Sequence, residues 1–258
     1  MTTRAPRPTD LVALVTFDEE VRENLAVTRE RIAHGNGAPT PLAAAFAQWL
    51  HLGHRTWVSV SGRQIRGIAT ARELGAKHAW EIDTLIEADD AHDREVLEDL
   101  LRQAIVAAEE AEVTHILLRT PEDSIAAEAA PRAGFSRVTV ERLWTGKLAP
   151  ASTTTRGVRE LTEDDRFASF QVYCRAMPVT ARQSMAMTVD EWNAIRDRHW
   201  QDRGDGALLA EQDSRVVATA RYARSTGQFT LTAEPDAHAA ADALLAALAR
   251  TQPPMEAP

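Results

Sequence analysis

Residues 80–119 decide the fold, because they contain a strand, a helix and a second strand in succession. WEIDTLIE at 80–87 alternates between apolar and polar residues with a period of two, which is typical of a β-strand. REVLEDLLRQAIVAAEE at 94–110 carries apolar residues at helical spacing, and THILLR at 114–119 is a short apolar run typical of a buried strand. The sequence therefore predicts mixed α/β structure here.

The residues on either side extend this pattern. Two strand-like runs, 55–60 and 64–73, are joined by Ser61-Gly62-Arg63, which predicts a hairpin. Four further elements are predicted: a strand (LVALVTF, 11–17), an amphipathic helix (18–32), a second helix (41–52), and a short helix (124–133) that Gly134 ends. Residues 136–148 predict a last strand. The order is strand, two helices, hairpin, strand, helix, strand, helix, strand.

The second part of the chain repeats features of the first. Residues 69–72 (ATAR) recur at 218–221, an offset of 149, and residues 90–92 (DAH) recur at 236–238, an offset of 146. The matches keep their order and fall in corresponding predicted elements, which favours an internal duplication. The predicted organisation is lobe one at 1–148, a linker at 149–156 and a partial lobe two at 157–258. Lobe two stops after its helix, so it is either a partial domain or part of a longer chain.

The composition excludes several classes of protein. The 258 residues are 44% hydrophobic and 26% charged, as expected of a globular protein with a core. A net charge of −9 argues against nucleic acid as a partner, and no apolar run is long enough to span a bilayer. The polar N-terminus has no signal-peptide core, so we expect a cytoplasmic protein. One cysteine, Cys174, excludes a disulfide framework.

The element order resembles that of the GNAT (Gcn5-related N-acetyltransferase) superfamily. The resemblance covers essentially all of 11–148 and, in partial form, 156–250. It is carried by the strand residues 82–86 (IDTLI), by Leu100-Leu101 in the following helix, and by residues 132–135 (RAGF), which end in the family's frequent Gly-Phe. Tandem GNAT lobes also occur in the family, as in mycothiol synthase-like enzymes. The expected fold is thus a mixed-sheet, GNAT-like α/β fold in tandem lobes.

The resemblance implies an enzyme that transfers an acetyl group from acetyl-CoA to the amine of a small-molecule or peptide acceptor. In this family the thioester lies between two parallel strands that splay apart, and the pyrophosphate lies at a helix N-terminus. The positions that would hold the cofactor lie on the third strand and in the following loop: Leu85, Ile86, Glu87, His92, Asp93, Arg94 and Glu95. The acceptor and the oligomeric state are not predicted.

The proposed loop departs from the family pattern. The usual Arg/Gln-x-x-Gly-x-Gly/Ala reads His92-Asp-Arg-Glu95-Val-Leu97 here, with no match at the three defining positions. Between residues 81 and 112 there are twelve acidic residues and two arginines, a local balance of −10. The tyrosine that often protonates the leaving thiolate is replaced by Ala130. In lobe two the equivalent loop, 236–241, has alanines in place of the glycines.

Glu81 and Asp83 are the candidate catalytic residues. They lie two apart on the third strand and therefore share one face of the sheet. In a GNAT-like lobe this strand borders the acceptor site, so either carboxylate could serve as the general base. The competing interpretation is that both are structural.

Other motifs predict less. The pair His51 and His54 lacks the glutamate of the His-Glu-x-x-His motif of metalloproteases, and Gly53 lies between the two histidines. No metal site is therefore expected. Cys174 is expected to be a small buried residue. Because of the degenerate loops, the alternative function is a non-catalytic GNAT-like scaffold or ligand-binding protein that has lost CoA binding. A regulatory partner of another enzyme is a third possibility.

Overall fold

The structure is a computed structural model, which describes residues 1–19, 23–28, 54–74, 79–88, 94–142, 148, 157–185, 187–197, 206–223 and 227–251. The chain divides into two compact units, Met1–Arg137 (unit 1) and Val138–Pro258 (unit 2). Each unit has its own sheet and its own buried cores. The predicted linker, 149–156, lies outside the described residues, so its boundaries stay a prediction.

Unit 1 is built on a five-stranded mixed sheet in the order β1-β2-β3-β4-β5. The first four strands pair antiparallel, and β5 pairs parallel to β4 after the crossover helix α4. Its elements are β1 (Thr2–Arg4), the 3-10 turn η1 (Pro8–Asp10), α1 (Leu11–Glu19), β2 (His54–Ser61), β3 (Gln64–Glu73), β4 (Ala79–Glu87), α4 (Arg94–Glu110), β5 (His115–Leu117) and α5 (Ile125–Ala133). The predicted fold class, α/β with a mixed sheet, is confirmed.

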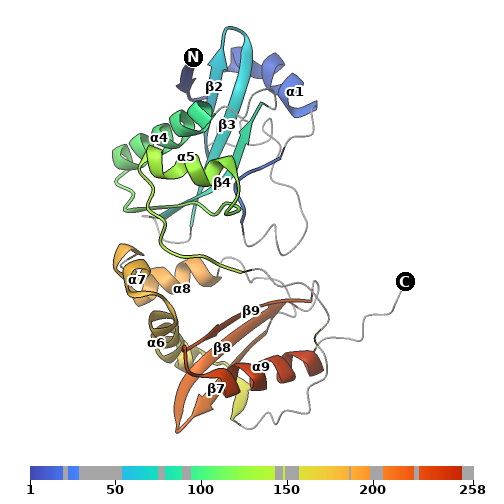
Figure 1. The fold of residues 1–258 in the computed structure, drawn as a ribbon, viewed down its shortest axis with the longest axis vertical. Coiled ribbons are helices and arrows are strands. Elements are labelled where there is room, and N and C mark those ends of the chain that lie inside the picture. The colour runs from blue at the N-terminus through green and yellow to red at the C-terminus, as the bar shows by residue number, and fades with distance from the viewer. Residues whose placement is uncertain are drawn as a thin grey trace, which may run out of the picture. The chain divides into compact units, whose positions relative to one another are not determined.

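Helices α4 and α5 cover one face of this sheet (Figure 1). Trp57, Ile82 and Leu85 of the sheet are buried there against Leu97 and Leu101 of α4. Burying each such side chain contributes about 1.5–3 kcal/mol, so this cluster is a main source of stability for unit 1. The prediction of the α4 helix and of strands β2 to β5 is confirmed, although β5 is shorter than predicted.

Helix α1 covers the opposite face, and it replaces the strand predicted for residues 11–17. Leu14 and Phe17 are buried against the sheet, and their spacing of three places them on one side of a helix. Asp10 accepts the backbone N–H of Arg7 at 2.7 Å and so stabilises the turn that leads into α1. A short apolar run fits a strand or a helix equally well, and the capped turn favours the helix.

Two other predictions are wrong in part. The helix predicted for 18–32 does not extend through 23–28, which form neither helix nor strand. The last strand, predicted for 136–148, is absent from 136–142, where Val140 is 51% exposed. Apolar β-branched residues form a strand only where a neighbouring strand pairs with them. The helix predicted for 41–52 lies outside the described residues.

Unit 2 contains a four-stranded antiparallel sheet in the order β6-β7-β8-β9. Helix α9 covers one face with Leu244 and Leu248, and α6 covers the other with Val172 (Figure 1). The elements are β6 (Val158–Glu160), η2 (Glu163–Asp165), α6 (Arg166–Ala176), α7 (Val179–Met185), α8 (Val189–Asp197), β7 (Gly206–Gln212), β8 (Arg215–Ala223), β9 (Gln228–Ala233) and α9 (His238–Thr251).

The two ATAR sequences lie in corresponding strands but not at the same register. Each lies in the second strand of a hairpin, β3 and β8, as predicted. Each of these strands carries a bulge after the turn, at Arg66 in β3 and at Val217 in β8. Ala69 is the third residue after its bulge, whereas Ala218 is the first after its own. The tetrads are therefore two residues out of step.

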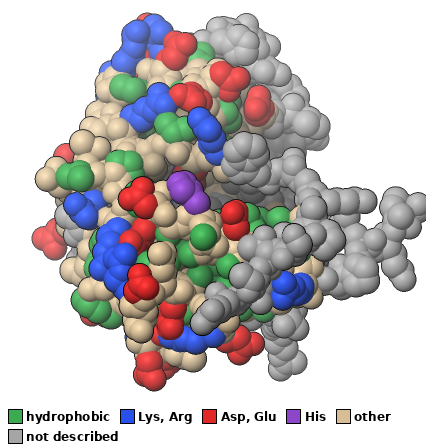
Figure 2. Space-filling view, turned by 60° about the horizontal axis from the view of Figure 1, so that its bottom comes forward, with side chains coloured by type: hydrophobic (Ala, Val, Ile, Leu, Met, Phe, Trp, Pro, Cys, Tyr) green, Lys and Arg blue, Asp and Glu red, His purple; other side chains and the backbone are tan. Residues whose placement is uncertain are grey.

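The surface mixes charges of both signs. On the face shown in Figure 2, arginine and acidic side chains lie interspersed. In unit 2, for example, Glu234 pairs with both Arg175 and Arg215, at 2.8 and 2.9 Å. No helix in the described part of the chain is both long enough and apolar enough to cross a membrane.

Candidate active site

A notch opens between the parallel strands β4 and β5. The two strands pair only where Ala79–Glu81 lie beside His115–Leu117. Strand β4 continues to Glu87, whereas β5 ends at Leu117. The edge of β4 beyond Glu81 is therefore not paired with β5, and it can bind another chain or a ligand through its backbone. This edge and the residues that follow Leu117 form what we call the notch.

Glu81 lies at the closed end of the notch. Its side chain is 1% exposed and forms ion pairs with Arg72 of β3 at 3.0 Å and with Arg119 at 2.5 Å. These charge-assisted bonds join β3, β4 and the segment after β5 at the point where the strands part. Both carboxylate oxygens are engaged by guanidinium groups, so Glu81 has the geometry of a structural residue.

Asp83 lies at a β-bulge beside the notch. Strand β3 pairs Thr70 with Thr84 and Ala71 with Ile82, so that Asp83 is the extra residue of β4. The Asp83 side chain is buried, at 4% exposed, and its Oδ1 accepts the hydroxyl of Thr70. A bulge turns side chains away from the regular alternation and is common next to active sites. Of the two predicted carboxylates, Asp83 therefore has the better geometry for chemistry.

Residues 23–28, which we call the strap, lie along this notch. Leu25 N–H donates to the carbonyl oxygen of Leu85 at 2.8 Å, and Val27 N–H donates to that of Arg119 at 2.8 Å. Asn24 Oδ1 accepts the N–H of Leu85 at 2.9 Å. The strap thus binds to β4 and to the segment after β5, where the two strands no longer pair.

Asn24 is the central residue of the strap. Besides Leu85 N–H, its Oδ1 accepts Ala26 N–H at 2.9 Å, and its Nδ2 donates to the backbone oxygen of Asp83 at 3.1 Å. The contact with Ala26 is an Asx turn, which bends the strap across the notch. Leu25 and Ala26 are buried in the same cluster as Leu85.

The predicted cofactor residues on β4 are all buried or half-buried. Leu85 is fully buried, and the strap engages both its backbone N–H and its backbone C=O. The Ile86 side chain belongs to the core on the α1 face of the sheet, so only its backbone could face a ligand. Glu87 ends β4 opposite Gly67 of β3. His92 and Asp93 lie outside the described residues.

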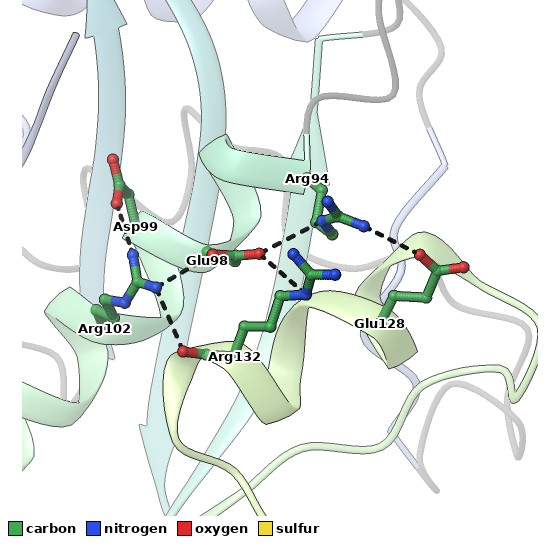
Figure 3. Close-up of polar contacts among 6 residues, drawn as sticks. All are labelled: Arg94, Glu98, Asp99, Arg102, Glu128 and Arg132. Atoms are coloured by element: carbon green, nitrogen blue, oxygen red, sulfur yellow. Dashed lines mark hydrogen bonds and ion pairs between the residues drawn. The ribbon is translucent and has the colours of Figure 1, made fainter.

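Arg94 and Glu95 begin α4, where the resemblance places the pyrophosphate. Glu95 is exposed, whereas Arg94 belongs to a network of ion pairs that joins α4 to α5 (Figure 3). Its guanidinium is 3.4 Å from Glu98 and 3.4 Å from Glu128. The Arg94 charge is thus balanced within the protein.

The same network accounts for part of the predicted acidic cluster. Glu98 is 9% exposed and also pairs with Arg102 at 3.1 Å and with Arg132 at 3.8 Å (Figure 3). Glu81 and Asp83 lie in the sheet. Arginines distant in sequence thus pair with two described members of the cluster: Arg72 and Arg119 with Glu81, and Arg132 with Glu98. Residues 89–93, which hold three more of its acidic side chains, lie outside the described residues.

Ala130 stands at the position where the resemblance would place a tyrosine. Ala130 is buried in α5, at 8% exposed. In unit 2, Tyr222 is buried close to Gly206, and Tyr173 packs against Phe170 and Trp192 with ring centroids 6.5 and 5.7 Å away. These tyrosines form part of the packing of unit 2.

Two further candidates from the sequence are Cys174 and the pair of His51 and His54. Burial raises the pKa of the Cys174 thiol, which makes it a poor nucleophile at neutral pH. Among the described residues, no three His, Cys, Asp or Glu side chains come together as a metal site would require. His51 and the side chain of His54 are not described.

Sequence reasoning missed Asn24, Thr70, Arg72 and Arg119. Asn24 falls within a stretch that fits a helical pattern, and its role depends on a strand far away in the sequence. One signal was available in the sequence: Thr70 and Arg72 lie on one predicted strand, and their partners Asp83 and Glu81 lie on the next. In the structure Arg72 lies directly opposite Glu81.

Comparisons with known proteins give structural similarities alone. No known family profile matches the sequence, and no curated protein matches it. The chain is similar to a protein described as a probable acetyltransferase, at 15% identity over 60% of this chain and 100% of that one, with a TM-score of 0.39.

Two other similarities concern enzymes with named acceptors. One is to the aminoglycoside 6'-N-acetyltransferase from Enterococcus faecium (11% identity, 43% of this chain and 57% of that one, TM-score 0.32). The other is to the ribosomal-protein-alanine N-acetyltransferase from Brucella melitensis (23% identity, 44% of this chain and 70% of that one, TM-score 0.31). In its strand order, its crossover helix and its notch between parallel strands, unit 1 has a GNAT-like fold.

Proposed function

We propose that unit 1 transfers an acetyl group from acetyl-CoA to an amine, and that the reaction takes place at the notch between β4 and β5. The observation that carries the proposal is the binding of the strap to the backbone N–H and C=O of Leu85. This contact supports a site in which the edge of β4 binds a chain that bears amide groups, next to the buried carboxylate of Asp83.

The residues of the notch fit the amide-bearing arm of the cofactor. The strap's atoms stand in for that arm: Leu25 N–H takes the place of an amide donor, and Asn24 Oδ1 the place of an amide acceptor. The backbone N–H and C=O of Leu85 and the carbonyl of Arg119 would hold the arm in the same way. Arg94, once released from Glu98 and Glu128, is the cation at the phosphate end.

Acetyl-CoA supplies the acyl group in activated form, as a thioester. In this proposal Asp83 would accept the proton that the acceptor amine loses as its nitrogen bonds to the acyl carbon. The bond between that carbon and the CoA sulfur would break, and CoA would leave as a thiolate that takes a proton from solvent. The Thr70 hydroxyl donates to one Asp83 oxygen and so orients the carboxylate. Glu81 holds the strands at the closed end through Arg72 and Arg119 and takes no proton.

The second candidate function is a GNAT-like protein without catalysis. It is favoured by two observations: the chain's own strap lies in the notch, and Arg94 is paired with Glu98 and Glu128 within the protein. The two candidates differ in whether the protein binds acetyl-CoA.

The test is a calorimetric titration of the whole chain with acetyl-CoA. It is followed by an assay for free CoA thiol in the presence of amino-acid, polyamine or peptide amines. The proposal predicts binding and a thiol release that depends on one class of amine. Complete failure to bind acetyl-CoA at millimolar concentration, even in strap variants, would leave the non-catalytic candidate.

A further inference from the structure

We infer that the strap is a built-in competitor for acetyl-CoA, and that the cofactor binds unit 1 only when residues 23–28 leave the edge of β4. The inference rests on the proposed function, because it concerns the same notch. It adds regulation: access to the site depends on an equilibrium within the chain itself.

The competition is for the same backbone atoms. The N–H of Leu85 is a single donor, and Asn24 Oδ1 already accepts it at 2.9 Å. The carbonyl of Leu85 accepts Leu25 N–H at 2.8 Å, and the carbonyl of Arg119 accepts Val27 N–H at 2.8 Å. A cofactor arm that paired with Leu85 would have to replace the strap there.

The strap is held by packing as well as by hydrogen bonds. Leu25 is 8% exposed, Ala26 is fully buried and Thr28 is 2% exposed. Leu25 and Ala26 belong to the cluster that includes Trp57 and Trp80. The buried side chains of the strap are part of the packing of unit 1. Exposing them to water, as the strap leaves the notch, therefore costs free energy.

The consequence is a reduced apparent affinity for acetyl-CoA. When the competent state is a minor population, the apparent dissociation constant rises in inverse proportion to that population. A partner or modification that draws the strap away would raise the affinity without touching the cofactor site.

The decisive variants weaken the strap in two independent ways. Asn24→Ala removes three hydrogen bonds, and Leu25→Ala removes the buried apolar anchor. The matched control is Asn193→Ala, an asparagine of unit 2 that is 6% exposed. Calorimetry with acetyl-CoA should show roughly 5–30-fold tighter binding for each strap variant, because the strap loses the hydrogen bonds of Asn24 in one variant and the buried side chain of Leu25 in the other. The control should match the unsubstituted chain.

Amide hydrogen exchange on the unsubstituted chain gives a readout that needs no variant. On addition of acetyl-CoA, the amides of Leu25 and Val27 should exchange faster, while that of Leu85 stays protected by its new partner. Either equal affinities in all four chains, or acetyl-CoA binding with Leu25 and Val27 still protected, would overturn the inference and leave the proposed function standing. No binding by any chain, with the strap amides of Asn24→Ala exchanging freely, would overturn the proposed function and the inference together.

Discussion

Arg159 holds the carboxylate of Asp165 with both terminal nitrogens, each 2.7 Å from a different oxygen. The same arrangement joins Arg4 to Asp10 in unit 1, at 2.6 and 2.9 Å. In each unit the arginine lies in the first strand and the aspartate ends the 3-10 turn before the first helix. The equal spacing of six residues supports the predicted duplication better than the ATAR tetrads, whose registers differ.

Asp165 should make unit 2 sensitive to acid. Hydrogen bonds from Arg159 hold the pKa of Asp165 well below its usual range. A carboxyl with a lowered pKa in the folded state stabilises it above the unfolded pKa of about 4 and loses that contribution as the pH falls through the folded value. Asp165→Asn should therefore cost about 1–3 kcal/mol at pH 7 and progressively less toward pH 2.

The measurement is the free energy of unfolding between pH 2 and 7. Asp164→Asn is the control, because Asp164 is exposed and adjacent. Asp10→Asn should show the same pH dependence in unit 1, where Arg4 lowers the pKa of Asp10. A cost for Asp165→Asn that stayed constant across this range would exclude the charge as its origin.

Glu81→Gln should lower the stability of unit 1. The substitution leaves Arg72 and Arg119, which are 19% and 28% exposed, without the carboxylate that joins them. We expect unit 1 to lose about 1–3 kcal/mol, less than for a fully buried pair because water reaches both cations. Denaturant unfolding measures this. An unchanged unfolding midpoint together with abolished turnover would instead identify Glu81 as the base.

Asp83→Asn should act on turnover. An amide cannot accept the proton of the amine, so the rate of amine-dependent thiol release should fall by about 10²–10⁴. Acetyl-CoA affinity should stay nearly constant, because the cofactor contacts are backbone groups. Thr70→Val should give a smaller loss, since it removes only the hydroxyl that orients the carboxylate. Full activity in Asp83→Asn would exclude this residue as the base.

Glu128→Gln should make Arg94 more available to the phosphate end of the cofactor, because only the ion pair with Glu98 then remains. The pair is exposed, with 37% and 70% of the side chains accessible, so we expect only about a 2–5-fold gain in acetyl-CoA affinity at low salt. Salt should remove the gain. Glu122→Gln is the matched control, because Glu122 pairs with Arg137. Equal effects of the two substitutions would show that Arg94 has no role at the phosphate end.

The hairpin, β4 and α4 could be predicted from sequence because local signals agree with the tertiary structure. Gly62 adopts a positive φ of 63° at the turn, as the Ser-Gly-Arg signal indicates, and α4 keeps one apolar side over its whole length. The prediction of a strand for residues 11–17 is wrong, because a run of seven residues, six of them apolar, is too short for its period to separate strand from helix.

The strap could not be predicted, because its conformation depends on contacts far away in the sequence. Asn24 meets Leu85, 61 residues later, and Val27 meets Arg119. Locally, the stretch 18–32 fits an amphipathic helix, and only the open edge of β4 makes another conformation favourable. The ion pairs of Glu81 could not be predicted for the same reason, because Arg72 and Arg119 lie apart from it in sequence.

The central claim is that acetyl-CoA binds in the notch of unit 1. The most direct test is the backbone amide signal of Leu85 in a nuclear magnetic resonance titration of the isotope-labelled chain with acetyl-CoA. We predict that the Leu85 signal shifts, together with those of Asp83 and Arg119, while amides of β8 in unit 2 do not move. Saturable shifts confined to unit 2, with Leu85 unchanged, would contradict the account.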